Sequence, residues 1–384
     1  MEPGRIMAKI KAKNQRQAGA LILACSFLVG FGIGALVFNA STNQGSILFT
    51  IAYSSEKEGW MAEIKPLFDE WCTARFPGLQ VKANFFPVGS RESIIAIINR
   101  QYTPAIWSPA AATWIPVLNH YWAEQPAFRG QAITTENVSA VYSPIVMAMW
   151  ESIATAYNIT SIQDVHDLTL VQPSPIKLAH TDPRLSNSGF CTVIMEVAVA
   201  AGKNSSDLVF SDLSNSSIKA WVKQFESVAV QYGKSTGYLL EAMLQAGPTG
   251  ITTAFLYENL IIESAAEAKS QWGDIIKAIY PAEGSIHSDH PFCVLDKAPW
   301  MTPTLLDISR AFMYEFLEDA RVLELATHHG FRPYNQTIPL PDTIFNNNNG
   351  VQNNISTFPK MAVPVDGDFT ARVSDFWLIN RPVF

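Results

Sequence analysis

The stretch "AHTDPRLSNSGFCTVIMEVAVAAG", residues 179–202, joins a polar, turn-rich run directly to an apolar segment with helical spacing. The overlapping residues "IKLAHTD" (176–182) favour a β-strand, so the pattern predicts a strand, a turn and a helix that begins near Gly189. The first backbone N–H groups of a helix have no partner inside it. Polar side chains cap them, or they bind a ligand with negative charge or oxygen acceptors. The polar residues at this helix mouth are Asp182, Ser186, Asn187 and Ser188.

Strand and helix patterns alternate on both sides of this stretch. "SILFTIAYSS" (46–55) favours a strand, and residues 55–78 repeat apolar side chains at helical spacing. Further strand and helix patterns follow, including the continuous apolar strand "VYSPIVMAMW" (141–150). This alternation predicts an α/β fold in which helices cover mostly parallel, doubly wound sheets.

Composition limits the class of protein. The chain has 384 residues, of which 48% are hydrophobic and 16% charged, so it can bury a core large enough for two domains or one two-lobed domain. The formal net charge is -7, and no basic stripe lies in the body of the chain. Nucleic-acid binding needs clustered Lys and Arg, so we expect no nucleic-acid partner.

The N-terminal region predicts a membrane anchor. Basic residues are frequent in residues 1–17, and "AGALILACSFLVGFGIGALVF" (18–38) carries no charge. About 20 apolar residues span a bilayer as a helix, and the basic flank stays in the cytoplasm. We therefore expect a single-pass protein of the cell membrane whose C-terminal part is extracellular or periplasmic.

Two other interpretations of this segment stay open. A cleaved signal peptide would leave the chain secreted, but Phe38 stands where a small residue is preferred. "LILAC" resembles a lipoprotein box ending at Cys25, although that cysteine comes early in the apolar run. Seven N-x-S/T tripeptides would permit glycosylation of an external surface, and they support that location only slightly.

The cysteines indicate neither a disulfide framework nor a zinc site. Apart from Cys25, the chain has Cys72, Cys191 and Cys293, an odd number without short spacing. One bridge with one free thiol is an alternative, but we expect three separate buried thiols.

Several segments, taken in order, resemble a known family. It is the type 2, two-lobed class of extracellular solute-binding proteins of ABC transporters, in the branch often associated with von Willebrand A domains. At longer range the sequence is similar to molybdate, sulfate and ferric-ion receptors. The segments that carry the resemblance are "IAYSSEKE" (51–58), "AIWSPAAATWIPVLN" (105–119), "YSPIVMAMW" (142–150), "LAHTDPRLSNSGF" (178–190), "YGKSTGYL" (232–239), "FLYENLII" (255–262), "VLDKAPW" (294–300) and "GFRPYN" (330–335).

The resemblance implies two α/β lobes, each a doubly wound and mostly parallel sheet, joined by crossing strands near 143–150 and 279–286. Lobe 1 would comprise residues 46–145 and 281–384, and lobe 2 residues 146–280. In this family a small molecule or ion binds between the lobes, the lobes close about a hinge, and an ABC permease receives the ligand. A von Willebrand A domain itself is not expected, because the tail after the lobes is too short.

Candidate ligand-binding residues lie at the ends of strands and before helices, where ligands of doubly wound sheets bind. The Ser- and Thr-rich character of these positions, without an obvious Arg or Lys in the cleft, favours an oxyanion. Ordinary capping and core packing are the alternatives at each position. The candidates are Ser54, Ser55, Ser90, Trp107, Ser108, Ser143, Asp182, Ser186, Asn187, Ser188, Gly189, Ser235, Thr236, Tyr257 and Glu258.

Two of the polar positions allow opposing interpretations. Glu258 in the cleft would disfavour an anion, or it forms a structural salt bridge. "HSDHP" (287–291) resembles a metal cluster, yet a polar hinge turn explains it better, and we assign no metal ligand. No catalytic motif and no cofactor motif is present, so we expect no enzyme.

The sequence thus predicts a membrane-anchored solute-binding protein with a small ligand, an ABC permease and the membrane as partners. The alternative is a receptor or adaptor of a surface complex that keeps the fold without transport. We expect Ser188→Ala and Gly189→Val to abolish ligand binding and to leave the unliganded fold largely intact.

Overall fold

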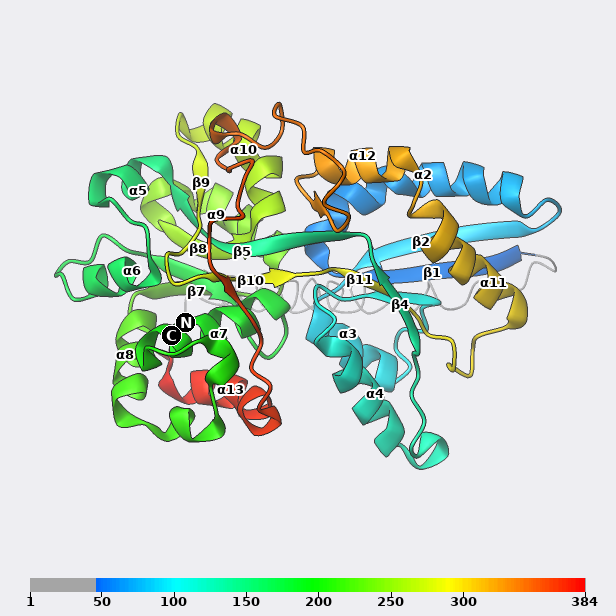
Figure 1. Ribbon diagram of the computed structural model, residues 1–384, viewed down its shortest axis with the longest axis horizontal. Coiled ribbons are helices and arrows are strands. Elements are labelled where there is room, and N and C mark those ends of the chain that lie inside the picture. Colours follow the sequence, from blue (N-terminus) through cyan, green and yellow to red (C-terminus); the bar gives the residue numbers. More distant parts are fainter. Residues whose placement is uncertain (1–45, 384) are drawn as a thin grey trace, which may run out of the picture. The chain divides into compact units, whose positions relative to one another are not determined.

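The computed structural model of the protein describes residues 46–383 (Figure 1). Residues 1–17 and the predicted membrane segment 18–38 lie outside the described residues. Among residues 46–383, no helix combines the length and apolar character needed to cross a bilayer. Strands and helices alternate from Ser46 onward, as the sequence pattern predicts.

One part of the fold, which we call lobe 1, is built on a five-stranded sheet with the order β2-β1-β3-β11-β4. β1 and β3 are parallel, whereas β11 is antiparallel to β3 and β4. The strands are β1 (Ser46–Tyr53), β2 (Gln80–Pro87), β3 (Ile106–Ser108), β4 (Glu136–Ser139) and β11 (Pro291–Val294). The helical elements are η1 (Ser55–Lys57), α2 (Glu58–Arg75), α3 (Ser90–Ile98), α4 (Trp114–Glu124), η2 (Pro126–Phe128), α11 (Pro303–Ala311), η5 (Phe312–Phe316) and α12 (Ala320–His328).

The core of lobe 1 follows from apolar periodicity. In α2, Trp60, Ile64 and Phe68 recur at helical spacing and are fully buried. Phe68 packs on Phe49 of β1 with ring centroids 4.9 Å apart, and on Phe312 of η5 at 5.4 Å. These aromatic contacts join α2 to the sheet and to the C-terminal helices of lobe 1.

The other part, lobe 2, is built on an eight-stranded mixed sheet in which β13-β10-β5-β8-β6-β7 is the main order and β9 and β12 also pair with β5. Its strands are β5 (Val141–Trp150), β6 (Leu178–Thr181), β7 (Ala229–Gly233), β8 (Thr253–Tyr257), β9 (Ile276–Ile279), β10 (Ser285–Ser288), β12 (Arg332–Pro333) and β13 (Lys360–Met361). Its helical elements are α5 (Glu151–Tyr157), α6 (Ile162–Thr169), α7 (Asn187–Ala201), η3 (Ser205–Asp207), η4 (Phe210–Ser214), α8 (Ser216–Glu226), α9 (Thr236–Gly250), α10 (Glu258–Trp272), η6 (Asn347–Asn349) and α13 (Gly367–Asn380).

The expectation of mostly parallel sheets needs correction: the sheet of lobe 1 is mixed, since β11 is antiparallel to β3 and β4, and the sheet of lobe 2 is mixed as well. β6 is parallel to β7 and β8, as expected for strand–helix–strand units. However, β5 is antiparallel to all four of its described partners, β8, β9, β10 and β12. β5 runs from lobe 1 into lobe 2, so its first residues lie near lobe 1. β8 runs the opposite way, because Tyr257 at its end pairs with Ile145 near the start of β5.

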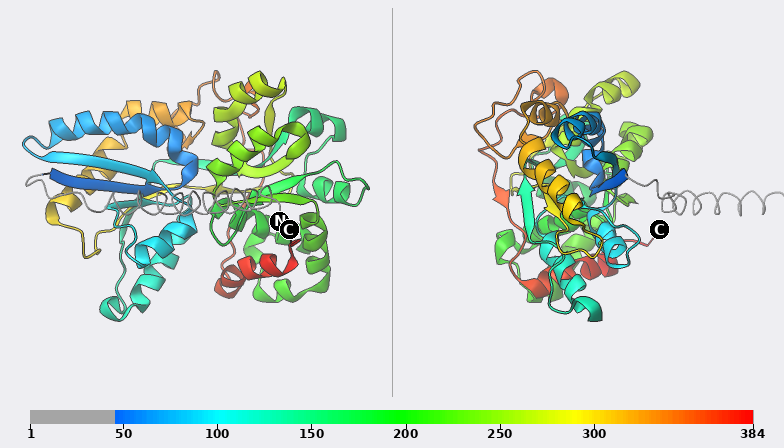
Figure 2. Two further views of the ribbon diagram at one scale, coloured as in Figure 1. Left: turned by 180° about the vertical axis from the view of Figure 1, so that it is seen from behind. Right: turned by 90° about the vertical axis from the view of Figure 1, so that its right-hand side faces the viewer.

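Two strand segments connect the lobes. β4 of lobe 1 ends at Ser139 and β5 begins at Val141, while β10 continues into β11 of lobe 1. β5 and β10 pair antiparallel, with Ser288 opposite Ser143. Figure 1 shows both strands running between the two sheets, and Figure 2 shows the same arrangement from behind.

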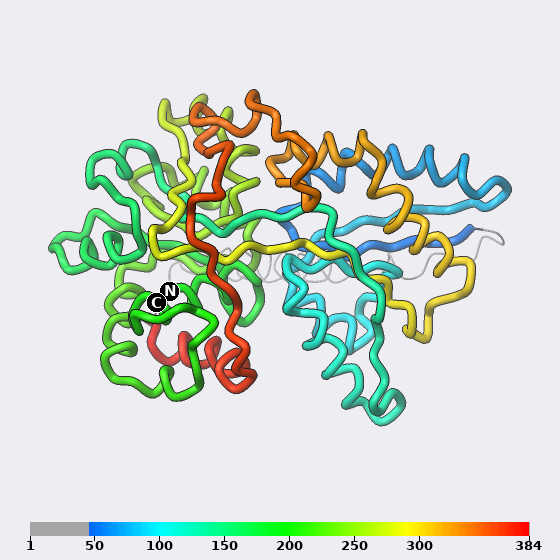
Figure 3. The backbone as a smooth tube through the Cα atoms, viewed as in Figure 1, coloured from blue at the N-terminus to red at the C-terminus, as the bar shows by residue number. Residues whose placement is uncertain are grey.

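The C-terminal segment returns from lobe 1 to lobe 2. Figure 3 follows the chain from α12 across to β13 and α13, and α13 packs against α7 and α8. Phe369, Val373 and Trp377 of α13 are buried. The division of the chain into lobes by residue number stays a prediction. It assigned residues 281–384 to lobe 1, whereas α13 packs on helices that the same division assigns to lobe 2.

The cysteines of the described chain are separate thiols. Cys72, Cys191 and Cys293 are buried and form no disulfide with one another. This agrees with the expectation of three separate buried thiols and not with the alternative of one bridge among them.

Candidate functional site

The residues before three helical elements do not act as side-chain caps. Ser54 precedes η1, Ser186 precedes α7 and Ser235 precedes α9, and none of these serines makes a capping hydrogen bond. Ser161 before α6 shows the contrast, because its side chain accepts from Asp164 N. Capping of the helix that follows therefore does not explain Ser54, Ser186 and Ser235.

Hydroxyl groups from both lobes meet where α9 begins. Ser55 Oγ of lobe 1 donates to Ser235 Oγ of lobe 2 over 2.9 Å, and Gly237 N donates to Ser55 Oγ over 3.2 Å. Within lobe 2, the Ser188 and Thr236 hydroxyls share a hydrogen bond of 2.7 Å. We call Ser55, Ser188, Ser235 and Thr236, with Thr181, the hydroxyl cluster.

Thr181 at the end of β6 completes this cluster. Its hydroxyl lies 2.7 Å from Ser188 Oγ and accepts from Gly189 N over 2.7 Å. Gly189 is required at this contact, because a Cβ there would lie 1.8 Å from the Thr181 carbonyl oxygen. The expectation that Gly189→Val leaves the unliganded fold intact is therefore wrong, since the clash is with backbone.

A second contact between the lobes involves α3 and α4. Arg91 N at the start of α3 donates to Leu185 O over 3.1 Å, and the indole N–H of Trp114 donates to Asn187 Oδ1 over 2.8 Å. Ser90 Oγ accepts from Ala110 N over 3.0 Å and so holds the loop after β3. The beginnings of α3 and α7 thus lie close to each other.

Asn187 links this contact to the connecting strands. Its side-chain amide donates to Tyr257 OH over 2.8 Å and to Ser288 Oγ over 3.0 Å. Burial raises the pKa of Tyr257 well above its ordinary value, so its hydroxyl is neutral. Asn187 is therefore bonded to lobe 1, to β8 and to β10 at once.

A buried group of charged side chains lies beside Ser54. Lys57 Nζ donates to Ser54 Oγ over 2.8 Å and to Ser108 O over 3.0 Å, and Glu56 accepts from the Ser54 hydroxyl. His290 Nδ1 lies 3.2 Å from Glu56 Oε1. Burial lowers the pKa of Lys57 to about 8, against the attraction of Glu56. Sequence reasoning missed Glu56 and Lys57, because charged residues in a polar turn are usually solvated.

The remaining predicted residues lie outside the hydroxyl cluster or have structural partners. Glu258 binds Arg332 through contacts of 2.6 and 2.8 Å and accepts from Tyr280, as the salt-bridge interpretation expects. Asp182 binds Arg184 at 2.6 Å. Ser143, Trp107 and Ser108 are also buried. Ser143 Oγ accepts from Asn259 N, and the Trp107 indole N–H donates to Ser93 Oγ. The backbone carbonyl of Ser108 accepts from Lys57 Nζ.

The "HSDHP" residues do not converge on one point. His287 stacks on Tyr142 with ring centroids 5.6 Å apart, and Asp289 Oδ1 accepts from Ala112 N over 2.8 Å. His290 lies beside Glu56. The three side chains serve separate contacts, which is the behaviour expected of a polar hinge turn.

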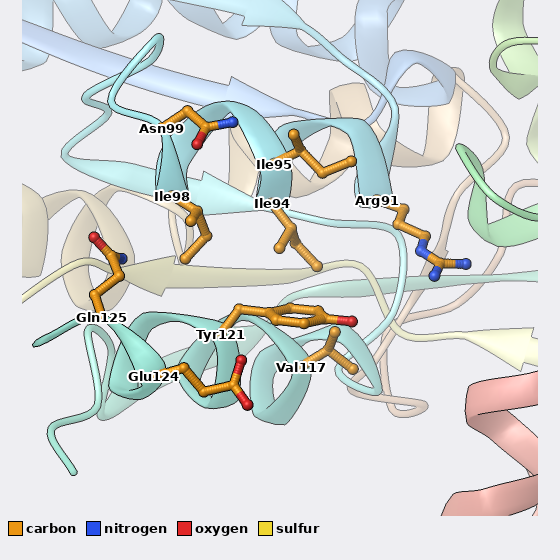
Figure 4. A pocket seen from close by; sticks show the side chains of 9 residues that line it. All are labelled: Arg91, Ile94, Ile95, Ile98, Asn99, Val117, Tyr121, Glu124 and Gln125. Atoms are coloured by element: carbon orange, nitrogen blue, oxygen red, sulfur yellow. The ribbon is translucent and has the colours of Figure 1, made fainter. Parts of the chain in front are cut away.

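A surface pocket between α3 and α4 contains none of the predicted residues. Figure 4 shows Ile94 and Ile98 of α3 facing Tyr121 of α4, with Arg91 at one end. Its lining is largely apolar, and of the residues in the contacts between the lobes described above it includes only Arg91, at the beginning of α3. The hydroxyl cluster and the α3–α7 contact therefore remain the candidate site.

Comparison with known proteins identifies both family and fold. A family model described as bacterial extracellular solute-binding protein matches residues 49–332. No curated protein matches the chain significantly. Among solved structures, the sulfate-binding protein of Mycobacterium tuberculosis H37Rv is 17% identical with a TM-score of 0.53, and the alignment covers 77% of this chain and 88% of that one.

Two further structures support the same fold. A periplasmic binding protein of Actinobacillus pleuropneumoniae with fructose-6-phosphate bound is 13% identical with a TM-score of 0.56, and 88% of this chain and 99% of that chain align. The ferric binding protein of Campylobacter jejuni is 12% identical with a TM-score of 0.55, with 86% and 96% aligned. At such identities the likeness concerns the fold alone, which is the predicted two-lobed α/β fold of periplasmic binding proteins.

Proposed function

Because this chain belongs to the family of bacterial extracellular solute-binding proteins, we propose that it captures a small oxyanion between its lobes and delivers it to an ABC permease. Residues 18–38 would anchor it at the outer face of the cell membrane. The lobes would open to admit the ligand and close around it, so that a permease distinguishes the loaded protein from the empty one.

The observation that carries this proposal is the convergence of the beginnings of α7 and α9, which the serines directly before them do not cap. α7 and α9 begin next to each other: Ser188 of α7 and Thr236 of α9 share a hydrogen bond, and Ser235 and Gly237 contact Ser55 of lobe 1. Helix beginnings attract anions through their N–H groups and the positive end of the helix dipole. Hydroxyl groups add neutral donors, which suit an oxyanion without requiring a counter-charge.

The charges around the cluster are compatible with an anion. The nearby carboxylate of Asp182 is paired with Arg184, and Glu258 is paired with Arg332. Lys57 lies directly behind Ser54, to which it donates a hydrogen bond. The carboxylate of Glu258, which would otherwise disfavour an anion, is therefore balanced by its own partner.

The fold accommodates ligands of this class and of others. One similar structure is a sulfate-binding protein and another holds fructose-6-phosphate, whereas a third is a ferric binding protein. The choice of an oxyanion for this chain consequently rests on its own side chains and helix beginnings.

Thermal unfolding of the full chain in mild detergent tests the proposal. Sulfate, phosphate and molybdate are compared with chloride at equal ionic strength. A bound oxyanion raises the melting temperature by mass action, and at about 100 times Kd it adds about 2.7 kcal/mol to the free energy of unfolding. We expect at least one of these oxyanions to do so.

Matched variants make this experiment specific. Ser188→Ala and Thr236→Val remove hydroxyls of the cluster, while Ser206→Ala removes an exposed serine hydroxyl elsewhere in lobe 2. Oxyanion stabilisation should persist in Ser206→Ala and vanish in the other two. If no oxyanion stabilises the chain, or if both cluster variants respond like the parent, the proposed ligand is wrong.

Anchoring is tested separately in cells. The full chain should fractionate with membranes, and external protease should digest residues 46–383 in intact spheroplasts. Release into the soluble fraction after N-terminal processing would show a cleaved signal peptide instead.

A further inference from the structure

Three potential metal ligands meet inside lobe 2, behind the hydroxyl cluster. His180 of β6, Glu196 of α7 and Glu226 of α8 are fully buried, and their ligand atoms all lie within 4.8 Å of one another. Neighbouring side chains of a strand point to opposite faces, so His180 faces away from the side occupied by Thr181. This group of three residues is therefore distinct from the candidate solute site.

The surroundings of His180 define which ring nitrogen is available. Its Nδ1 lies 2.7 Å from the Thr181 carbonyl oxygen, which can only accept a hydrogen bond. Nδ1 therefore carries a proton, and in the neutral ring Nε2 has a free lone pair. Nε2 lies 2.9 Å from Glu226 Oε1, so two acceptors face each other unless a proton or a cation lies there.

Glu196 provides a second, independent observation. Both of its carboxylate oxygens are buried and accept no hydrogen bond from a protein donor of the described chain, and a hydrogen bond with the neighbouring Glu226 can form only if one of the two carboxyls carries a proton. Among residues 46–383, the only salt bridge of Glu226 is with His180, and Glu196 has none. Burying charge without a partner is strongly unfavourable, so two adjacent carboxylates in this interior must either bind a cation or take up a proton.

We propose that His180, Glu196 and Glu226 bind a divalent transition-metal ion inside lobe 2. An imidazole with two carboxylates suits Zn²⁺ and Mn²⁺, and the charge of the ion balances the two carboxylates. The Thr181 carbonyl orients the imidazole, and Tyr232 OH donates to Glu226 Oε2 over 2.7 Å. Such outer partners are typical of metal ligands. Three protein ligands leave a position for water.

The ion would join β6, α7 and α8, and two of these elements, β6 and α7, lead to the candidate solute site. β6 leads into Thr181, and α7 begins with Asn187 and Ser188. Trp377 of α13 packs against His180, with the ring centroids of the two side chains 5.7 Å apart. The ion would thus stabilise the packing of β6 on α7 and α8.

A proton shared by Glu196 and Glu226 beside a charged His180 is the competing description. It also balances the charge, but it predicts no response to metals or chelators. The two descriptions are separated by measuring metal directly.

The first measurement uses the full chain purified in mild detergent without added chelator. Inductively coupled plasma mass spectrometry should find a stoichiometric divalent metal, or the chain should take up equimolar Zn²⁺ or Mn²⁺ after refolding in its presence. Chelation during unfolding and refolding should lower the melting temperature, and Zn²⁺ or Mn²⁺ should restore it. Co²⁺ should give visible absorption bands.

Variants identify the ligands. Glu196→Gln and His180→Gln should lose the metal and the response to chelation, whereas Glu263→Gln should keep both. Glu263 is the matched control because it also contacts a histidine, His329 Nδ1 at 2.6 Å, at another place. If a variant does not fold, the parent chain decides the question. The proposal is overturned if the parent chain binds no metal and its melting temperature responds neither to chelator nor to Zn²⁺ or Mn²⁺. A Glu196→Gln chain that keeps the metal also overturns it.

Discussion

Ser55 and Ser235 lie 180 positions apart in the chain, and the hydroxyl of Ser55 donates to that of Ser235 over 2.9 Å. One serine belongs to lobe 1 and the other to lobe 2, and both are buried. The backbone N–H of Gly237 also donates to Ser55 Oγ. The two lobes therefore touch through small polar groups at the beginning of α9, and side-chain size there controls how closely they approach.

Gly237→Val should hold the lobes apart. A Cβ at Gly237 would already lie 3.1 Å from the Ser55 carbonyl oxygen, and valine adds two methyl groups. We expect a larger radius of gyration by small-angle scattering and an oxyanion affinity lowered by about tenfold, or about 1.4 kcal/mol. Gly367→Val is the control, because no atom lies within 4 Å of a Cβ at that position. Equal radii for Gly237→Val and Gly367→Val would contradict the prediction.

Asn187→Leu should destabilise the closed arrangement. The change leaves the indole N–H of Trp114 without its acceptor and the Tyr257 hydroxyl without its donor, and both groups are buried. An unsatisfied buried polar group costs about 1–3 kcal/mol, and we expect a loss in this range or above it in urea unfolding. Asn347→Leu replaces an exposed asparagine and should leave stability nearly unchanged. A loss of similar size in both variants would show a general effect of the substitution.

Arg332→Met should strongly destabilise the fold. Arg332 and Glu258 are almost completely buried, and their contacts are 2.6 and 2.8 Å. Removing one partner of a buried ion pair costs about 3–5 kcal/mol, because the remaining charge has no partner. Adding Glu258→Met should recover part of this loss in chemical unfolding.

The exposed pair Arg310–Glu136 offers the comparison for that prediction. Arg310→Met should have a much smaller effect, since water and salt screen exposed ion pairs. A double variant no more stable than Arg332→Met alone would show that Arg332 acts through its bonds to the carbonyls of Gln352 and Asn353.

His287 should make stability depend on pH. Burial and the charges of Lys360 and Arg332 lower its pKa to about 4, and the ring stacks on Tyr142. An unfolded histidine titrates near 6.5, so between pH 6.5 and 4 the unfolded chain binds more protons. The free energy of unfolding therefore falls as the pH falls through this window, by at most about 3 kcal/mol.

The variant His287→Phe keeps an aromatic ring against Tyr142 and should remove this part of the pH dependence. His120→Phe is the control, because His120 is largely exposed. Urea unfolding at pH 6.5 and at pH 4.5 measures the difference. A pH dependence that is the same in His287→Phe and His120→Phe would exclude His287 as its source.

Local patterns predicted the parts of the site that depend on neighbouring residues. The hydroxyl-bearing residues at the beginnings of α7 and α9 could be predicted from polar runs that lead directly into apolar helices. Two of them, Ser188 and Thr236, have hydroxyls 2.7 Å apart in the structure. The family resemblance implied crossing strands near 143–150 and 279–286, and these ranges overlap β5 (Val141–Trp150) and β10 (Ser285–Ser288). These features can be predicted from the sequence because strand, turn and helix preferences depend on a few neighbouring residues.

Contacts between distant segments could not be predicted in the same way. Glu56 and Lys57 lie in a polar turn that reads as solvated, and only the approach of β3 and His290 buries them. His180, Glu196 and Glu226 likewise read as isolated polar residues, because β6, α7 and α8 bring them together only in the folded chain. The packing of α13 on α7 depends on a chain reversal after β12 that no local signal specified.

The position of α13 bears on how this protein should be produced. An expression fragment ended at residue 332, where the family match stops, would lack β13 and α13. It would uncover the apolar surface of α7 and α8 on which Phe369, Val373 and Trp377 pack, and such a surface promotes aggregation. Purification tags are therefore better joined after Phe384 than substituted for the last fifty residues or so, because the α13 helix in that segment covers the apolar surface of α7 and α8.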